Sequence, residues 1–508
     1  MDFKITNYDV ATEQICLEQM AEIPIDADFS VADYEGEIKK VLKCEIIPYI
    51  TSKQISSNTL HTEGEAIIKV IYCSPEGEIC SHEQGVPFKK SFEGGKNMDG
   101  GYCEISKDAF IHSCRAVTER KFSIRGAVKV EAVVKTIDKK EIISDIDNSY
   151  FEQLKGEAFA TTPIGKTEKN LIIDEEITLP SNMPSAKQII HSYGSAAITD
   201  CKIIADKIIV KGNLKITMLY TSEEKAIKKF CTNLPFNQIV DMVGISELCD
   251  CDAAVTICGL NISPRNSDDG EYRKFMLICK LEISASAKCN NLVPVIYDLY
   301  STRYAVTPRC EEVAFSKIIK QVNESFLCKK TLNMPNGEGR EILDVWCKIG
   351  SRSAKFDSNN GLLYGSLTAC VLYNDSEGEP NYFEHIIDFE YPFTLEGDIN
   401  APYCNPEINI SDCDYSVTNS GEPELKVEMI IKAVIYDTVR YSLITALNVD
   451  ENSTKENNSA LVAYYADKGE NVWEIAKSFL ANRSEFMSLN HLTEETVQNP
   501  KMLLIPLI

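Results

Sequence analysis

The sequence lacks the motifs that mark the common catalytic sites. It contains no GxxxxGK[ST] phosphate loop, no HExxH zinc motif and no GxSxG nucleophile elbow. The 6 histidines form no pair at i, i+3 or i, i+4 spacing, and no CxxC occurs. The sequence therefore predicts a protein that is not an enzyme and that uses no metal and no cofactor. The abundant carboxylates leave a paired acid/base site as an alternative.

Positive charge and long apolar runs are also scarce. Lys and Arg number 52 against 76 Asp and Glu, which gives a formal net charge of −24. Such a chain repels phosphate backbones and anionic headgroups, so nucleic acid is not an expected partner. The sequence has neither a run of about 18 apolar residues nor a basic N-terminal region followed by an apolar stretch. We therefore expect no transmembrane segment, no export and a cytoplasmic location.

The cysteines point to the same compartment. The chain has 19 of them, an odd number, and several lie inside apolar runs, as Cys279 does in FMLICKLEI and Cys370 in LTACVLY. A reduced, buried cysteine behaves as a small hydrophobic residue. This usage indicates a reducing compartment rather than a secreted disulfide scaffold.

What the sequence does contain is a threefold repeat with a period of roughly 150 residues. Each copy has an aliphatic pair, a glycine 22 residues after it, a tyrosine 8 residues later and a phenylalanine 16 residues after the tyrosine. These positions are Leu42, Gly64, Tyr72 and Phe88 in the first copy, Ile190, Gly212, Tyr220 and Phe236 in the second, and Leu343, Gly365, Tyr373 and Phe389 in the third. One ancestral module in three copies explains this pattern.

The stretch between each glycine and tyrosine alternates between apolar and polar residues. In the second copy Leu214, Ile216 and Met218 share the parity of Tyr220, and the same parity holds in the other copies. A period of two predicts a β-strand with one buried face. A turn-like segment after each tyrosine predicts a hairpin, and a further alternating run ends each copy. Each copy is therefore predicted to be a β-sandwich or an α+β module.

A cysteine also recurs late in each copy, as Cys114, Cys258 and Cys413. Three matched cysteines are either a metal or redox set or a recurring buried position, and we favour the buried position.

The composition suggests where the modules begin and end. The first 35 residues resemble an extension, KGEAFATTPIGKTEK at 155–169 resembles a joint, and ENSTKENNS has almost nothing to bury. The predicted divisions are an extension with the first repeat at 1–154, the second repeat at 155–312, the third at 313–450, a flexible linker at 451–459 and a small domain at 460–508.

Residues 460–508 predict a βααβ domain. LVAYYA and MLLIP are the strands, and Val472, Ile475, Ala476 and Phe479 form the apolar face of the first helix. Asn471 is the expected N-cap of that helix, and Ser484 that of the second. Such a small core needs nearly every apolar residue it has.

This segment resembles the LysM family, because Tyr465, KGENVWEIAKSF, LNHL and NPKMLLIP occur in the family's order. The resemblance implies a ligand groove between two loops. The groove residues it implies are Gly469, Glu470, Asn471, Val472 and Trp473, with Val497, Gln498, Asn499, Pro500 and Lys501. Glu470-Asn471 and Lys501-Met502 depart from the family pattern, which weakens the expectation of sugar binding. Trp473 could stack on a sugar, although helical spacing favours packing.

Repeats of this kind followed by one LysM domain resemble the SipL-type spore morphogenetic proteins, which carry SPOCS domains. The resemblance implies a scaffold in the mother-cell cytoplasm, concentrated at the forespore surface. It further implies that the LysM domain binds the ATPase of the coat's basement layer, that the protein helps anchor the coat, and that other coat proteins are possible partners. The alternatives are a glycan-binding protein of the wall or cortex and, less favoured, a wall hydrolase targeted by LysM.

Overall fold

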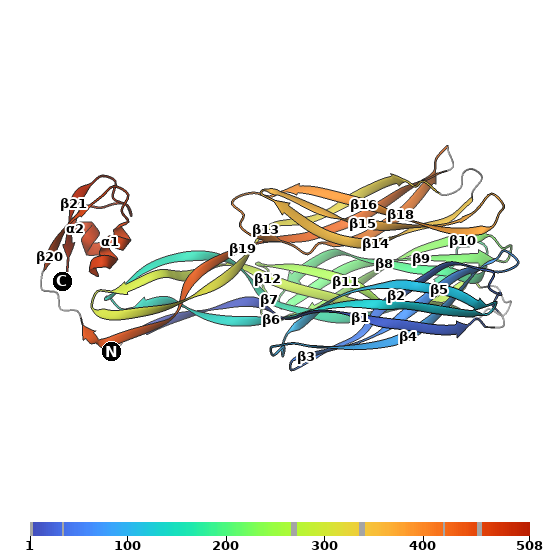
Figure 1. Cartoon of the computed structure of the whole chain (residues 1–508), viewed down its shortest axis with the longest axis horizontal. Coiled ribbons are helices and arrows are strands. Elements are labelled where there is room, and N and C mark those ends of the chain that lie inside the picture. Colours follow the sequence, from blue (N-terminus) through green and yellow to red (C-terminus); the bar gives the residue numbers. More distant parts are fainter. Residues whose placement is uncertain are drawn as a thin grey trace.

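The computed structural model describes residues 4–32, 35–265, 272–334, 341–419, 422–454 and 460–507. The fold is mainly β, as predicted, with three repeats of antiparallel strands followed by a small domain that contains two helices (Figure 1). The described part of each repeat contains strands and no helix, so of the two predicted alternatives the β-sandwich is correct and the α+β module is not.

Each repeat uses its strands in the same order. The first repeat contains β1 (Lys4–Ser30), β2 (Lys40–Ser56), β3 (Thr59–Cys73), β4 (Ile79–Glu93), β5 (Tyr102–Thr118) and β6 (Lys121–Asp147). The second contains β7 (Phe151–Thr178), β8 (Ala186–Ile204), β9 (Lys207–Ser222), β10 (Ile227–Asp241), β11 (Cys249–Pro264) and β12 (Lys274–Ser301). The third contains β13 (Tyr304–Thr331), β14 (Glu341–Asp357), β15 (Asn360–Asn374), β16 (Pro380–Thr394), β17 (Pro402–Tyr403), β18 (Glu407–Val417) and β19 (Pro423–Thr454).

Two sheets make up each repeat. A short sheet has the order β2-β3-β4, β8-β9-β10 or β14-β15-β16. A long sheet has the order β1-β6-β5 or β7-β12-β11, and in the third repeat β13 pairs with β19, which also pairs with β17 and β18. The two sheets of each repeat enclose an apolar core, and the three cores are separate clusters. This is the face-to-face packing of a β-sandwich.

The repeating glycine, tyrosine and phenylalanine have one physical origin in the hairpin of the short sheet. Each glycine stands directly opposite a phenylalanine of the next strand, as Gly64 opposite Phe88, Gly212 opposite Phe236 and Gly365 opposite Phe389. A Cβ on these glycines would come within 2.3 Å of the Phe88 and Phe236 rings and 2.7 Å of the Phe389 ring. The ring therefore covers the glycine, and no other residue leaves room for it.

The repeat tyrosines occupy equivalent places, as the spacing predicts. They lie near the end of the middle strand of each short sheet, on β3, β9 and β15, and their side chains are buried. The predicted turns after them join β3 to β4, β9 to β10 and β15 to β16. The hairpin prediction is thus confirmed in all three repeats.

The three short sheets meet in a shared apolar cluster, and this accounts for the aliphatic pair of each copy. Leu42, Ile190 and Leu343 all belong to it, together with Ile71, Leu219 and Leu372. The residue that follows each aliphatic pair is polar and buried: Lys43, His191 or Asp344. The junction between repeats therefore combines an apolar cluster with buried polar groups.

Ion pairs between repeats compensate the buried charges at this junction. Lys43 Nζ lies 2.6 Å from Glu384 Oε1, and Lys229 Nζ lies 2.8 Å from Asp344 Oδ1. Glu45 is paired with Lys348. Burial acts to raise the pKa of Glu45, but Lys348, His191 and Lys43 outweigh it and lower that pKa to about 2. A buried charge without such partners would cost several kcal/mol, so these pairs tie the repeats to one another.

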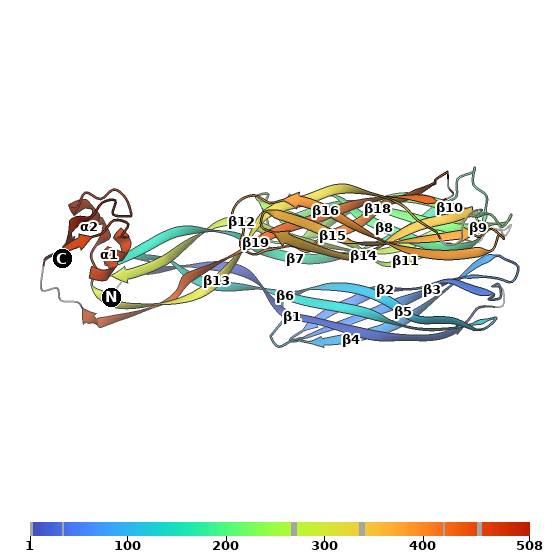
Figure 2. The ribbon, with the colours of Figure 1, turned by 45° about the horizontal axis from the view of Figure 1, so that its top comes forward.

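The long strands extend beyond the sandwiches and form an arm. Strands β1, β6, β7, β12, β13 and β19 have 27–32 residues each. Figure 2 shows their ends leaving the sandwiches together and running toward the small domain. An apolar cluster inside the arm takes side chains from all three repeats, among them Val10, Ile142, Ala158, Val293, Val313 and Leu443. The arm is thus one shared core rather than three separate ribbons.

The repeats begin at other residues than predicted, because their first strands belong to the arm. The predicted boundaries at 155 and 313 fall inside β7 and β13, and the connections lie at 148–150 and 302–303. The first 35 residues are no extension, because β1 pairs with β6 from Lys4 to Ser30. The segment predicted to be a joint is the edge strand β7, where Pro163 is tolerated since an edge needs fewer N–H donors. Of the predicted linker, 451–454 belong to β19 and 455–459 lie outside the described residues.

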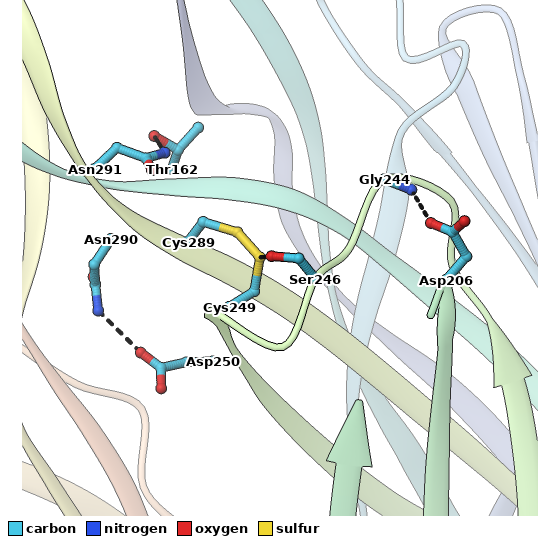
Figure 3. Close-up of a disulfide and its surroundings, with 9 residues drawn as sticks. All are labelled: Thr162, Asp206, Gly244, Ser246, Cys249, Asp250, Cys289, Asn290 and Asn291. Atoms are coloured by element: carbon cyan, nitrogen blue, oxygen red, sulfur yellow. Dashed lines mark hydrogen bonds between the residues drawn. A yellow bond between two sulfur atoms is a disulfide. The ribbon is translucent and has the colours of Figure 1, made fainter. Parts of the chain in front are cut away.

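One pair of cysteines departs from the expectation of reduced thiols. Cys249 on β11 and Cys289 on β12 are direct partners in the antiparallel register and form a disulfide (Figure 3). Because the two residues stand opposite each other on neighbouring strands, their side chains meet. The other cysteines are free thiols.

Candidate functional site

The small domain that carries the predicted groove has the βααβ order expected for 460–508. It consists of β20 (Leu461–Ala466), α1 (Val472–Phe479), α2 (Arg483–Leu489) and β21 (Lys501–Pro506). The two strands pair antiparallel along their whole length. Trp473, Ala476, Phe486, Leu503 and Ile505 form its core. Among the described residues, no helix is long and apolar enough to cross a membrane.

The helix caps show what local sequence predicts and where it fails. Asn471 caps α1 as predicted, since its Oδ1 accepts a hydrogen bond of 2.8 Å from the Trp473 N–H. The prediction of Ser484 for α2 is wrong, because Asn482 Oδ1 accepts from the Glu485 N–H at 2.9 Å. Ser484 lies inside the helix, and its hydroxyl donates to Asn482. Asn482 stands one residue before the helix in the extended conformation that an N-cap requires.

Backbone hydrogen bonds bring the two predicted groove loops together. The Gly469 N–H donates to the Val497 carbonyl at 2.8 Å, and the Val497 N–H donates to the Glu470 carbonyl at 2.9 Å. Gly469 has a φ of +94°, a conformation that favours glycine. The loop before α1 and the loop before β21 therefore form one surface, as the groove prediction requires.

Burial divides the predicted groove residues into two groups. Val472, Trp473 and Val497 lie in the core of the domain, so their side chains offer no surface to a ligand. Gly469, Asn471, Gln498, Asn499 and Pro500 are exposed, and Glu470 and Lys501 are half-buried. The accessible surface of the predicted groove consists of this second group.

The half-buried members of the groove have partners within the domain. The Glu470 carboxylate accepts from the Tyr464 hydroxyl at 2.9 Å and from the Asp467 N–H at 2.9 Å. The hydrogen bond to Glu470 raises the pKa of Tyr464. Lys501 Nζ donates to the Asn490 carbonyl at 3.4 Å, which leaves its charge near the surface. Glu470 therefore holds the loop, whereas Lys501 can meet a ligand.

Trp473 faces the arm and not the groove. Its ring is only 2% exposed and lies 5.1 Å from the ring of Tyr300, centroid to centroid. Its Nε1 donates to Asp298 Oδ2 at 2.8 Å. Asp298 and Tyr300 both belong to β12, at the end of the arm. The indole therefore packs between the small domain and the second repeat, as its helical spacing favoured.

Further polar contacts hold the small domain on the end of the arm. Lys477 Nζ lies 2.5 Å from Asp298 Oδ2, and the Tyr300 hydroxyl donates to the Ala481 carbonyl at 2.7 Å. Asn482 Nδ2 donates to Glu152 Oε1 at 2.7 Å, and burial raises the pKa of Glu152. Sequence reasoning missed Asp298, Tyr300 and Glu152, because no local pattern relates them to a domain far along the chain.

Replacing Asp298 by alanine is expected to loosen the small domain from the arm. The change removes the acceptor of Trp473 Nε1 and the charge partner of Lys477, at a cost of about 1–3 kcal/mol. Amide hydrogen exchange in α1 should accelerate by roughly tenfold. Asp145→Ala is the matched control, because it breaks an exposed pair with Lys155 elsewhere on the arm. Equal exchange of α1 in the two variants would contradict the docking role of Asp298.

Comparison with known families finds one match, in two places. The sequence model of "SipL, SPOCS domain" matches residues 37–115 and 185–264. These segments contain the short sheet and the following strand of the first and second repeats, β2–β5 and β8–β11. The third repeat has the corresponding strands β14–β18 in the same order. The chain matches no curated protein and no solved structure.

Proposed function

We propose that this chain, a SipL-type protein with SPOCS repeats and thus a sporulation-related coat protein, is a non-enzymatic scaffold in coat assembly. The match of two repeats to the SPOCS domain is the observation that carries this proposal. The scaffold acts from the mother-cell cytoplasm at the forespore surface and helps anchor the coat. Its partner is the ATPase of the coat's basement layer, and its contact surface is the groove of the small LysM-like domain.

Two features of the small domain support this assignment. The groove loops are hydrogen-bonded into one surface whose tip, at Gln498, Asn499 and Pro500, stays exposed in the whole chain. The other side of the small domain is fixed to the arm, because Trp473 binds its partners on β12. The arm separates this domain from the three sandwiches (Figure 1). A partner can therefore reach the small domain without contact to the sandwiches.

Lys501→Glu should weaken capture of the ATPase by the full-length chain. A charge reversal at this half-buried lysine places a like charge against a complementary partner surface, which costs enough to reduce affinity by about tenfold or more. Lys330→Glu is the matched control, since it makes the same charge change at an exposed site on β13. Partner capture from purified components measures the effect, and circular dichroism verifies that both variants fold.

The glycan alternative is tested in the same series. The full-length chain and both variants are mixed with insoluble peptidoglycan and pelleted. The scaffold proposal expects little pelleting of any variant and loss of ATPase capture with Lys501→Glu alone. Strong pelleting of the unaltered chain, without capture of the ATPase, would overturn the proposal in favour of a glycan-binding wall or cortex protein.

A further inference from the structure

Each repeat brings two cysteines together along the same seam of its sandwich. At this seam an edge strand of the short sheet runs beside an edge strand of the long sheet: β2 beside β5, β8 beside β11, and β14 beside β18. The seam pairs are Cys44 with Cys114, Cys201 with Cys251, and Cys347 with Cys413. The two sheets have no backbone ladder between these strands, so side chains alone hold the seam.

The thiols of each seam pair lie close to one another. The Sγ atoms of Cys201 and Cys251 are 3.3 Å apart. The thiols of Cys44 and Cys114 lie close enough for each to shift the pKa of the other, and Cys413 likewise raises the pKa of Cys347. All of these side chains are half-buried, so they contact the core and are also within reach of a small reagent. An approach of about 1.3 Å would bring Cys201 and Cys251 to the ~2.05 Å length of a disulfide bond.

The pairs do not stand at one repeated position. Cys44 is opposite Val70 on β3, Cys201 is opposite Val210 on β9, and Cys347 is opposite Ala369 on β15. Measured from the repeat tyrosine, these partners lie at different distances along the middle strand. The matched set Cys114, Cys258 and Cys413 is therefore only partly related to the pairs, since the Cys258 thiol donates to the Thr256 carbonyl instead. Each seam therefore has one cysteine pair, and the pair lies at a different position along the seam in each repeat.

We propose that the seam pairs are oxidation sites, at which a small-molecule disulfide converts each dithiol into a disulfide that joins the two sheets of the repeat. The second repeat already contains the disulfide between Cys249 and Cys289 (Figure 3). Cys249 stands two residues before Cys251 on the same strand, β11. The strand β11 therefore accommodates a sulfur bridge at its start. Oxidation at the seams adds one bridge between sheets in every repeat.

The oxidation proceeds by two successive thiol–disulfide exchanges. One cysteine thiolate attacks the small disulfide, which releases one small thiol and leaves a mixed disulfide on the protein. The second cysteine then attacks the protein sulfur, and the second small thiol leaves. Two S–H bonds break, one S–S bond forms in the protein, and the reagent gains the two electrons and the two protons. The hydrogen bond from Cys201 lowers the pKa of the Cys251 thiol, which favours Cys251 as the first nucleophile.

The test treats the full-length, unreduced chain with oxidised glutathione, blocks the remaining thiols by alkylation and maps linked peptides by mass spectrometry. We expect the links Cys44–Cys114, Cys201–Cys251 and Cys347–Cys413. We expect mixed disulfides at Cys231 and Cys310, whose side chains are exposed. Because the new bridges constrain the unfolded chain, the midpoint of unfolding in denaturant should shift to a higher concentration.

Single serine variants identify each bridge. Cys251→Ser should remove only the link in the second repeat, whereas Cys258→Ser, on the same strand, should remove none. Glutathione retained on the seam cysteines, or links between different repeats, would overturn the proposal. Unreacted seam pairs beside fully modified Cys231 and Cys310 would also overturn it, since the reagent would then have been shown to be active.

Discussion

Substituting Gly212 by alanine is expected to destabilise the second repeat by about 3 kcal/mol. The added Cβ would lie 2.3 Å from the Phe236 ring and 2.5 Å from the Ala197 carbonyl oxygen. The ring could rotate away, but the carbonyl belongs to the backbone of β8, which is paired with β9. Relief of the clash therefore requires the two strands to separate. Urea unfolding should show the loss as a lower midpoint with an unchanged slope.

Gly165→Ala is the matched control for this prediction. Gly165 also lies inside a strand, β7, but nothing stands within 4 Å of the position its Cβ would take. Alanine is expected to leave stability within about 0.5 kcal/mol or to raise it slightly, because it restricts the unfolded chain. Equal midpoints for Gly212→Ala and Gly165→Ala would show that the phenylalanine does not cover the glycine.

Acidification is expected to weaken the junction of the three repeats through His191. Burial, together with Lys69, Lys348 and Lys43, lowers the pKa of His191 from 6.5 to about 3, although Glu45 acts in the opposite direction. Among the described residues, His191 Nδ1 has no hydrogen-bond partner, and its ring lies 5.0 Å from that of Trp346. A proton on this ring would introduce a charge into an apolar and already charged junction.

The folded and the unfolded chain differ in the protonation of His191. Between pH 6.5 and about pH 3 the unfolded chain binds a proton at His191 that the folded chain does not bind. Stability from this group is therefore complete above pH 6.5 and falls as the pH decreases. At 1.36 kcal/mol per unit, the loss reaches about 2–3 kcal/mol by about pH 4.5. Glu45, with a pKa of about 2, stays ionised over this range and does not contribute to the loss.

Two variants isolate the histidine from the general effect of acid. His191→Phe keeps a ring against Trp346 and cannot take up a proton, so it should flatten the pH dependence of the unfolding free energy. His112→Phe makes the same change at an exposed position and should leave that dependence as it is. Parallel pH curves for the unaltered chain and His191→Phe would contradict a role for His191 at the junction.

Short-range pattern was enough to predict the elements whose physics is local. Alternation identified β3, β9 and β15 and their buried tyrosines, because a strand with one buried face must repeat every two residues. The constant interval between glycine and phenylalanine follows from a hairpin of constant length. The βααβ order and the Asn471 cap likewise depend on neighbours a few residues away. The groove loops, by contrast, were placed by the resemblance to the LysM family.

Long-range packing decided the rest. By composition, β1 and β7 resembled an extension and a joint, since edge strands of a shared arm need few apolar residues and tolerate proline. Nothing near Trp473 in the sequence indicates Asp298 or Tyr300, and nothing near Cys201 indicates Cys251. The sequence by itself determined the repeat, its strands and the form of the small domain. Only the tertiary structure decided the arm, the polar junction, the seam pairs and the seating of the groove, because each depends on surfaces that meet only after the strands have formed.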